Sequence, residues 1–273
     1  MRSLHAVSLT QNVLAWLADS SQRRMLHVFE SACNLINGDK EILSVVTSRT
    51  GNGPFNLVVD GEMPFPQYIH ANSVVSILNR QLTLGELTID TGNAELWNPG
   101  PNWGGLHANR ESILAQLISL PIEHYQPILP DSLMVGLSSA MVNSDIPSAQ
   151  LITSRLAGLG AGLTPAGDDF ILGSLLATWI IHPPESARVL AKEVADTAGP
   201  LTTSLSAAWL RSAGRGEAGI LWHEFFNVLL STDSAGIQNA MDEILAVGET
   251  SGSDAMAGFM DSFVYWGQHR SNL

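Results

Sequence analysis

The segment from Gly158 to Pro184 constrains the fold more than any other part of the sequence. Glycines at positions 158, 160 and 162 precede Thr164-Pro165, and an apolar run then covers residues 170–181 up to His182 and two prolines. Thr164 before Pro165 is typical of an N-cap with proline at the first helical position, and the later prolines end a helix. Because the run is hydrophobic nearly all round, it predicts a buried helix at the centre of a helical domain.

The glycine-rich loop before this helix is a candidate anion site. Glycine permits positive φ and a close approach of a ligand to the backbone, and a helix N-terminus offers N–H groups and a positive dipole end. We therefore expect Gly160, Gly162 and Thr164 to bind substrate, beside an acidic pair, Asp168 and Asp169. The structural alternative is that the aspartates only stabilise the helix, by about 0.3–1 kcal/mol, and that the glycines only shape a turn. The loop is neither a Walker loop nor a Gly-x-Gly-x-x-Gly motif.

The charge balance restricts the ligands and partners. The 273 residues include 13 Lys and Arg against 26 Asp and Glu, a formal net charge of −13, which disfavours nucleic acid and anionic membranes as partners. The lone cysteine, Cys33, excludes an internal disulfide. No signal peptide and no apolar stretch of about 18 residues is visible, so we expect a cytoplasmic protein.

Turn signals and periodicity divide the chain. Short strand patterns with Gly, Asn and Asp turns fill the first hundred residues, and helical periods follow. The sequence therefore predicts an α+β protein: a β-rich domain at residues 1–98, forming a small antiparallel β barrel or sandwich, then a Pro/Gly linker at 99–109. The C-terminal all-helical domain at 110–273 is expected to surround the central buried helix.

Two further segments carry candidate site residues. Thr250, Ser251 and Asp254 echo the Thr, Gly and Asp pattern of the first loop before another predicted helix, although Ser251-x-x-Asp254 also resembles a capping box. Ser204 and Arg211 lie one above the other on the helix predicted from residue 202, where we expect Leu201, Leu205 and Trp209 to form the apolar stripe. Because a guanidinium matches carboxylate or phosphate bidentately, Arg211 is a candidate anion ligand.

The sequence gives weaker indications of a metal site and of a ligand site in the β-rich domain. The eight histidines include no pair at metal-ligand spacing, and no metal site is predicted from them. The cofactor is left unassigned; Mg²⁺ held by Asp168, Asp169 and Asp254 together with a phosphate is one reading. In the β-rich domain, the loop around Asn52 and Gly53 either is an ordinary connection or offers backbone N–H groups to a substrate.

Four segments make this chain resemble the AllH-like family, which is named after a subunit of oxamate carbamoyltransferase. They are residues 160–169, with their Gly-Leu-Thr-Pro-x-x-Asp-Asp core, and residues 201–211, 248–254 and 51–55. The resemblance covers the chain, more weakly before residue 100, and many family members have no assigned activity. It implies FdrA-like and AllG-like partner proteins and transfer of a carbamoyl group between phosphate and a small amide such as oxamate.

On this hypothesis, catalytic roles fall to Asp168, Asp169, Arg211 and Asp254. The substrate-binding residues would be Asn52, Gly53, Gly160, Gly162, Thr164, Ser204, Thr250 and Ser251. Two other functions stay open: a stand-alone Mg²⁺-dependent enzyme acting on a phosphorylated metabolite, and a non-catalytic assembly subunit whose glycines and aspartates only cap helices.

Overall fold

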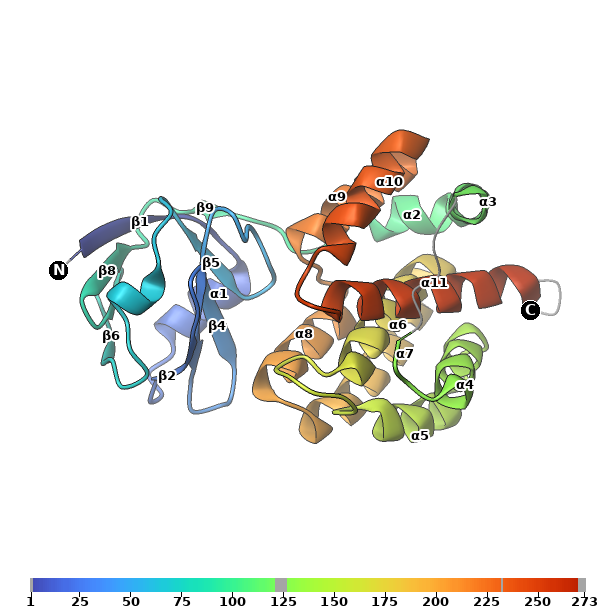
Figure 1. The fold of residues 1–273 in the computed structure, drawn as a ribbon, viewed down its shortest axis with the longest axis horizontal. Coiled ribbons are helices and arrows are strands. Elements are labelled where there is room, and N and C mark those ends of the chain that lie inside the picture. Colours follow the sequence, from blue (N-terminus) through green and yellow to red (C-terminus); the bar gives the residue numbers. More distant parts are fainter. Residues whose placement is uncertain (1, 121–126, 232, 270–273) are drawn as a thin grey trace. The chain divides into compact units, whose positions relative to one another are not determined.

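The computed structural model describes residues 2–120, 127–231 and 233–269. The chain divides into two compact units, Met1–Pro99 and Gly100–Leu273 (Figure 1). Each unit has a hydrophobic cluster of its own.

The N-terminal unit is built on one curved sheet that forms a nearly closed barrel. Its strands are β1 (Arg2–Leu9), β2 (Arg24–Val28), β3 (Ala32–Ile36), β4 (Ile42–Thr47), β5 (Asn56–Val59), β6 (Val75–Leu78), β7 (Gln81–Leu84), β8 (Leu87–Asp90) and β9 (Glu95–Leu96). Their spatial order is β2-β3-β4-β5-β1-β8-β7-β6, and β9 pairs with β1. The predicted small β barrel is confirmed, but the sheet is mixed rather than antiparallel throughout, because β1–β8, β1–β9 and β4–β5 are parallel pairs.

Helix α1 (Gln11–Ala18) and a short 3-10 turn, η1 (Phe65–Gln67), complete this unit. Helix α1 was not among the elements expected from the sequence. Thr10 determines where it begins: its hydroxyl accepts from the Val13 N–H at 3.2 Å and donates to the Pro54 carbonyl at 2.8 Å. The helix buries Val13 and Trp16 against the sheet cluster.

The second unit is helical. Its helices are α2 (Trp103–Ala108), α3 (Arg110–Ser119), α4 (Asp131–Val142), α5 (Ile146–Leu156), α6 (Ala166–Ile181), α7 (Pro184–Ala198), α8 (Ser204–Gly214), α9 (Ile220–Ser231), α10 (Ser234–Leu245) and α11 (Ser251–His269), with a 3-10 turn, η2 (Gly199–Leu201), before α8. Helix α2 lies inside the stretch that we expected to be a linker. Two glycines do not prevent it because the Asn102 side chain caps it, accepting from the Gly105 N–H at 3.1 Å.

Helix α6 is the centre of the helical unit, as predicted. Apart from Ala166 and Leu172, all its residues are buried, and it contacts α2, α4, α5, α7, α8 and α11. Its start differs from the prediction: Pro165 is the N-cap and no side chain caps the helix. Thr164 does not cap α6 because its hydroxyl pairs with that of Ser251, at 2.8 Å.

The apolar stripe predicted for α8 is wrong. Its buried residues are Ser206, Ala207, Leu210, Ser212, Ala213 and Gly214, whereas Leu201, just before the helix, is 49% exposed. Small side chains bring α8 close to α7, since a Cβ on Gly214 would lie 2.7 Å from the Ala195 Cβ. The close approach of the two backbones thus buries the face of α8 that carries the small residues, and Leu201 remains exposed.

Candidate functional site

The loop between α5 and α6 has the backbone that its glycines predict. Gly158, Gly160 and Gly162 have φ values of 74°, 122° and 95°. Residues 158–163 are exposed. The chain therefore presents an exposed loop, in which Gly158, Gly160 and Gly162 have positive φ, directly before its most buried helix.

Internal hydrogen bonds hold the two ends of this loop. The Gly158 N–H donates to Asp168 Oδ1 at 2.8 Å, and the Leu159 N–H donates to the Leu156 carbonyl at 2.9 Å. The Gly167 N–H in turn donates to the Leu159 carbonyl at 2.9 Å, so the loop folds back over the beginning of α6. Part of the helix N-terminus that we expected to face a ligand is thus used by the chain itself.

The middle of the loop is different. Among the residues that the structure describes, the N–H groups of residues 160–164 have no hydrogen-bond acceptor. Exposed N–H groups in a stretch of positive φ are a recognised way of holding an anion. The candidate anion site therefore centres on residues 160–164 rather than on the helix terminus.

Asp168 is bound on several sides by protein groups. It is 2% exposed, and besides the Gly158 N–H it accepts the Thr202 hydroxyl through a short hydrogen bond. Burial raises its pKa, and these hydrogen bonds, with that of Ser206, oppose the rise. Asp168 thus ties the loop to the segment that precedes α8.

Asp169 and Asp254 form a second acidic group, between α6 and α11. They are 7% and 1% exposed, and Asp169 Oδ2 is buried with no hydrogen-bond partner among the described residues. Burial raises the pKa of Asp169 to about 8; the Ser251 and Thr164 hydroxyls act against the rise, and the charges of Asp254 and Asp168 add to it. Burial and the neighbouring carboxylates therefore favour the protonated form of Asp169.

The two segments with similar sequence, around Thr164 and around Thr250, are in contact. Thr164 and Ser251 are joined by their hydroxyls, and α6 and α11 cross closely beyond them. A Cβ on Gly173 would lie 1.8 Å from the Ala255 carbonyl oxygen, and one on Gly258 would lie 2.0 Å from that of Phe170. The two helices therefore pack closely at these glycines, which brings both acidic segments to one end of the pair.

The remaining predicted residues of the helical unit lie at the edge of this site. Thr250 is exposed, and its carbonyl accepts from the Asp254 N–H at 2.8 Å. Ser204 begins α8, whose N-cap Thr203 donates to the Leu163 carbonyl at 2.6 Å. The loop and the start of α8 are therefore directly bonded.

Arg211 is exposed two turns further along α8. Its guanidinium lies beside Gly199, within 3.4–3.7 Å of where a Cβ would be. Gly199 is two residues from Leu201, whose carbonyl lies 2.6 Å from the corresponding position on Gly158. Within the described part of the chain Arg211 forms no ion pair, whereas Arg215 pairs with Glu217 at 2.6 Å. Arg211 is thus an uncommitted cation beside the turn that borders the loop.

Asn52 and Gly53 belong to the N-terminal unit, where their loop is held to β1. The Ser8 hydroxyl donates to Asn52 Oδ1 at 2.5 Å. The Gly53 carbonyl accepts from the Asn56 N–H at 3.1 Å, and a Cβ on Gly53 would lie 2.6 Å from the Asn56 amide nitrogen. These contacts describe a tight loop held in place by hydrogen bonds.

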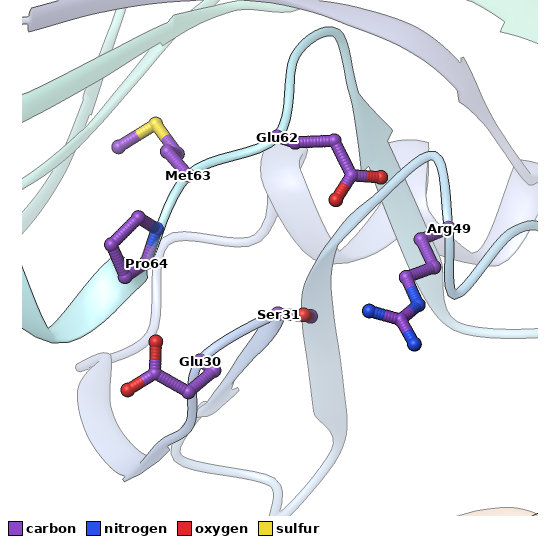
Figure 2. Close-up of a pocket in the computed structure, with 6 residues that line it drawn as sticks. All are labelled: Glu30, Ser31, Arg49, Glu62, Met63 and Pro64. Atoms are coloured by element: carbon purple, nitrogen blue, oxygen red, sulfur yellow. The ribbon is translucent and has the colours of Figure 1, made fainter.

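The N-terminal unit also contains a pocket that the sequence did not reveal. It has a volume of about 330 Å³ and is lined by Glu30, Ser31, Arg49, Glu62, Met63 and Pro64 (Figure 2). In the described residues Arg49 forms no ion pair. Two carboxylates border this pocket, so it suits an anion less well than the loop does. The charged lining has no pattern in the sequence because its members come from three separate loops.

A metal-binding cluster and a membrane-spanning helix were sought in residues 2–120, 127–231 and 233–269. These residues contain no group of three or more His, Cys, Asp or Glu side chains arranged to hold a metal ion, so Asp168, Asp169 and Asp254 do not form such a group. No helix among them is both long enough and apolar enough to cross a bilayer.

Comparison with known proteins gives two family matches. Residues 156–263, which contain the loop, α6, α8 and most of α11, match the family model described as oxamate carbamoyltransferase subunit AllH. Residues 5–96 match the AllH family N-terminal domain. No solved structure matches the chain.

Proposed function

The chain belongs to the AllH family, and on that premise we propose that it is one subunit of a cytoplasmic carbamoyltransferase of the oxamate carbamoyltransferase type. Its substrates would be carbamoyl phosphate and a small amide that carries a carboxylate, such as oxamate. We further propose that one of these anions binds at residues 160–164, and that FdrA-like and AllG-like proteins are the other subunits.

The observation that carries this proposal is the unused, exposed N–H groups of the loop. A phosphate or carboxylate needs several converging donors, and a chain with a net charge of −13 must provide them locally. The positive φ values of Gly160 and Gly162 orient backbone donors without placing a side chain between them and a ligand. These features support the loop as the anion site.

The reaction would need little covalent participation by the protein. The amide nitrogen of the acceptor attacks the carbamoyl carbon, the bond from that carbon to the phosphate oxygen breaks, and phosphate leaves with the electron pair. The nitrogen loses one proton, either to the departing phosphate or to a protein base. Positioning and stabilisation of the negative charge that develops then account for most of the catalysis.

Each predicted residue has a proposed role. Gly160, Gly162 and Thr164 would hold the anion, and Arg211 would turn from Gly199 to neutralise it. Asp168 is proposed as a positioning residue, because its hydrogen bonds go to Gly158 and Thr202.

The residues around α11 would complete the site. Asp169 and Asp254, with Ser251, would orient the hydroxyl of Thr164, which is in contact with Ser251. Ser204 and Thr250 would line its edge. Separately, the loop of Asn52 and Gly53 in the N-terminal unit is proposed to contact a substrate through its own backbone N–H groups.

The test is steady-state kinetics of the enzyme reconstituted with its FdrA-like and AllG-like subunits, following phosphate release and the carbamoylated product. For Arg211→Ala we expect the KM for carbamoyl phosphate or oxamate to rise about 10- to 100-fold, the effect of losing a hydrogen bond to a charged group. Arg188→Ala, at an exposed arginine of α7, is the control and should leave the kinetics unchanged.

A glycine pair tests the loop itself. Gly162 and Gly61 both have positive φ, 95° and 82°, and a Cβ would meet nothing within 4 Å at either. Alanine is therefore strained by a positive φ at both positions, but only Gly162→Ala should weaken substrate binding. Unchanged kinetics for both Arg211→Ala and Gly162→Ala, with folding intact, would show that the anion binds elsewhere and favour an assembly role. Activity of this chain alone would instead favour a stand-alone enzyme.

A further inference from the structure

Exposed apolar side chains surround the candidate anion site. Leu159, Leu163, Leu201 and Val247 are 39%, 36%, 49% and 43% exposed. They come from three segments that are far apart in the sequence: the loop before α6, the turn before α8 and the turn before α11. We call these four residues the loop face.

Contacts between the segments show that the four residues share one region. The Leu163 carbonyl accepts the Thr203 hydroxyl at 2.6 Å, and the Leu201 carbonyl lies 2.6 Å from where a Cβ of Gly158 would be. On the other side, Val247 lies 3.3 Å from the corresponding position on Gly252, next to Ser251, whose hydroxyl contacts that of Thr164. The loop face therefore surrounds the N-termini of α6, α8 and α11.

An open site of this kind is incomplete for the proposed reaction. Residues 158–163 are exposed to water, and water would compete with the acceptor amide for the carbamoyl carbon. Group transfer to the amide requires a surface that excludes water from the loop. The same surface would bury the leucines, which contribute to association in proportion to the apolar area removed from water.

We propose that the loop face is the docking surface for a different subunit of the same enzyme, which closes the anion site when it binds. This inference rests on the proposed function. The matched family is described as a subunit of an enzyme, so a partner chain is expected.

Charge favours a different chain over a second copy of this one. Two copies, each with a net charge of −13, repel one another. Glu249, next to the loop face, is exposed as well. The partner chemistry that fits is an apolar patch with Lys or Arg at its rim.

The first experiment measures assembly. Leu159→Ser combined with Leu163→Ser changes two exposed side chains of the loop, and the matched control combines Leu151→Ser with Val189→Ser, at residues of α5 and α7 that are 58% and 54% exposed. Each variant is titrated with the purified FdrA-like and AllG-like subunits and followed by sedimentation velocity. We expect at least a tenfold weaker association with one of them for the loop variant and no change for the control. Equal association of both variants, or loss of a homodimer instead, would overturn the proposal.

Hydrogen exchange provides a second readout that does not depend on activity. The amides of residues 160–164 should exchange rapidly in the chain alone and slowly in the complex. If they are already protected in the chain alone, the loop is covered within the chain and the proposal is wrong.

The two proposals fail in different ways. If the loop variant fails to assemble while Gly162→Ala in the assembled enzyme leaves the KM values unchanged, the docking surface stands and the anion site does not. If the loop variant assembles normally but Gly162→Ala raises a KM, the anion site stands and the docking surface does not.

Discussion

Asp169 is the residue whose charge the fold opposes most clearly. It is 7% exposed, its Oδ2 has no hydrogen-bond partner among the described residues, and Asp254 and Asp168 add like charge. Its folded-state pKa of about 8 lies far above the usual value of an aspartate. Between these two values the folded chain holds a proton that the unfolded chain has lost.

The contribution of Asp169 to the free energy of unfolding should therefore fall as the pH rises from about 4 to about 8. The contribution of Asp169 is complete below the unfolded pKa and is lost as the pH passes through the folded one. Asp169→Asn removes the titration, so its stability should decline less steeply, by at most about 1.4 kcal/mol per pH unit. Urea unfolding at pH 5, 7 and 9 measures this. Parallel curves for the wild-type chain and Asp169→Asn would contradict the prediction.

Cys33 gives a second prediction at this scale. It is completely buried in β3, and burial raises the pKa of its thiol to about 12. Because the thiolate is the reactive form, a thiol reagent such as DTNB should not label the native chain at pH 8 and should label it fully in denaturant. Labelling of the native chain at the rate of a free thiol would mean that β3 opens readily.

Individual residues also show what the sequence could and could not predict about the candidate site. The acidic pair and the glycines of the loop were identified from their types and spacing, since only glycine adopts positive φ at little cost. What the spacing could not predict is the use made of them. Asp168 bonds back to Gly158, and Thr164 pairs with Ser251 across 87 positions of sequence instead of capping its own helix.

At the scale of elements, hydrophobic periodicity predicts a helix or strand correctly where a single local pattern determines its type. Strands β4 and β5 and the buried α6 follow directly from apolar runs bounded by turn residues. It fails where packing between elements determines the buried face, as in α8, where that face consists mostly of small residues together with Leu210. Strand β1 alternates exposed and buried residues, but its place between β5 and β8 at the centre of the sheet follows from no local pattern.

The crossing of α6 and α11 carries a prediction about these small residues. A Cβ on Gly173 would lie 1.8 Å from the Ala255 carbonyl oxygen, a backbone atom that cannot move without separating the helices. We expect Gly173→Ala to lower the free energy of unfolding by about 3 kcal/mol, the upper part of the usual range for overpacking.

Gly104→Ala is the matched control for this substitution. It lies in helix α2, and a Cβ there would meet nothing within 4 Å. It should be neutral or stabilising by about 0.5–1 kcal/mol, because alanine favours helix over glycine. Chemical denaturation measures the free energy of unfolding of both variants. Equal values would show that α6 and α11 are not as close as the structure places them.

At the scale of the whole molecule, the two units have separate hydrophobic clusters. Phe65 and Leu57 belong to the first cluster, and Phe170 and Phe259 belong to the second. A unit with its own core is able to fold alone. The chain is therefore expected to unfold as two cooperative units rather than as one.

Expression of residues 1–99 and 100–273 as separate fragments tests this expectation. Each fragment should give a cooperative calorimetric transition, and the two unfolding enthalpies together should account for that of the intact chain. The Gly173→Ala substitution should shift only the transition of the helical fragment, because α6 and α11 both lie within it. If neither fragment folds, or if Gly173→Ala shifts both transitions of the intact chain equally, the two cores depend on each other for stability. The anion site would then have to be studied as a property of the whole chain.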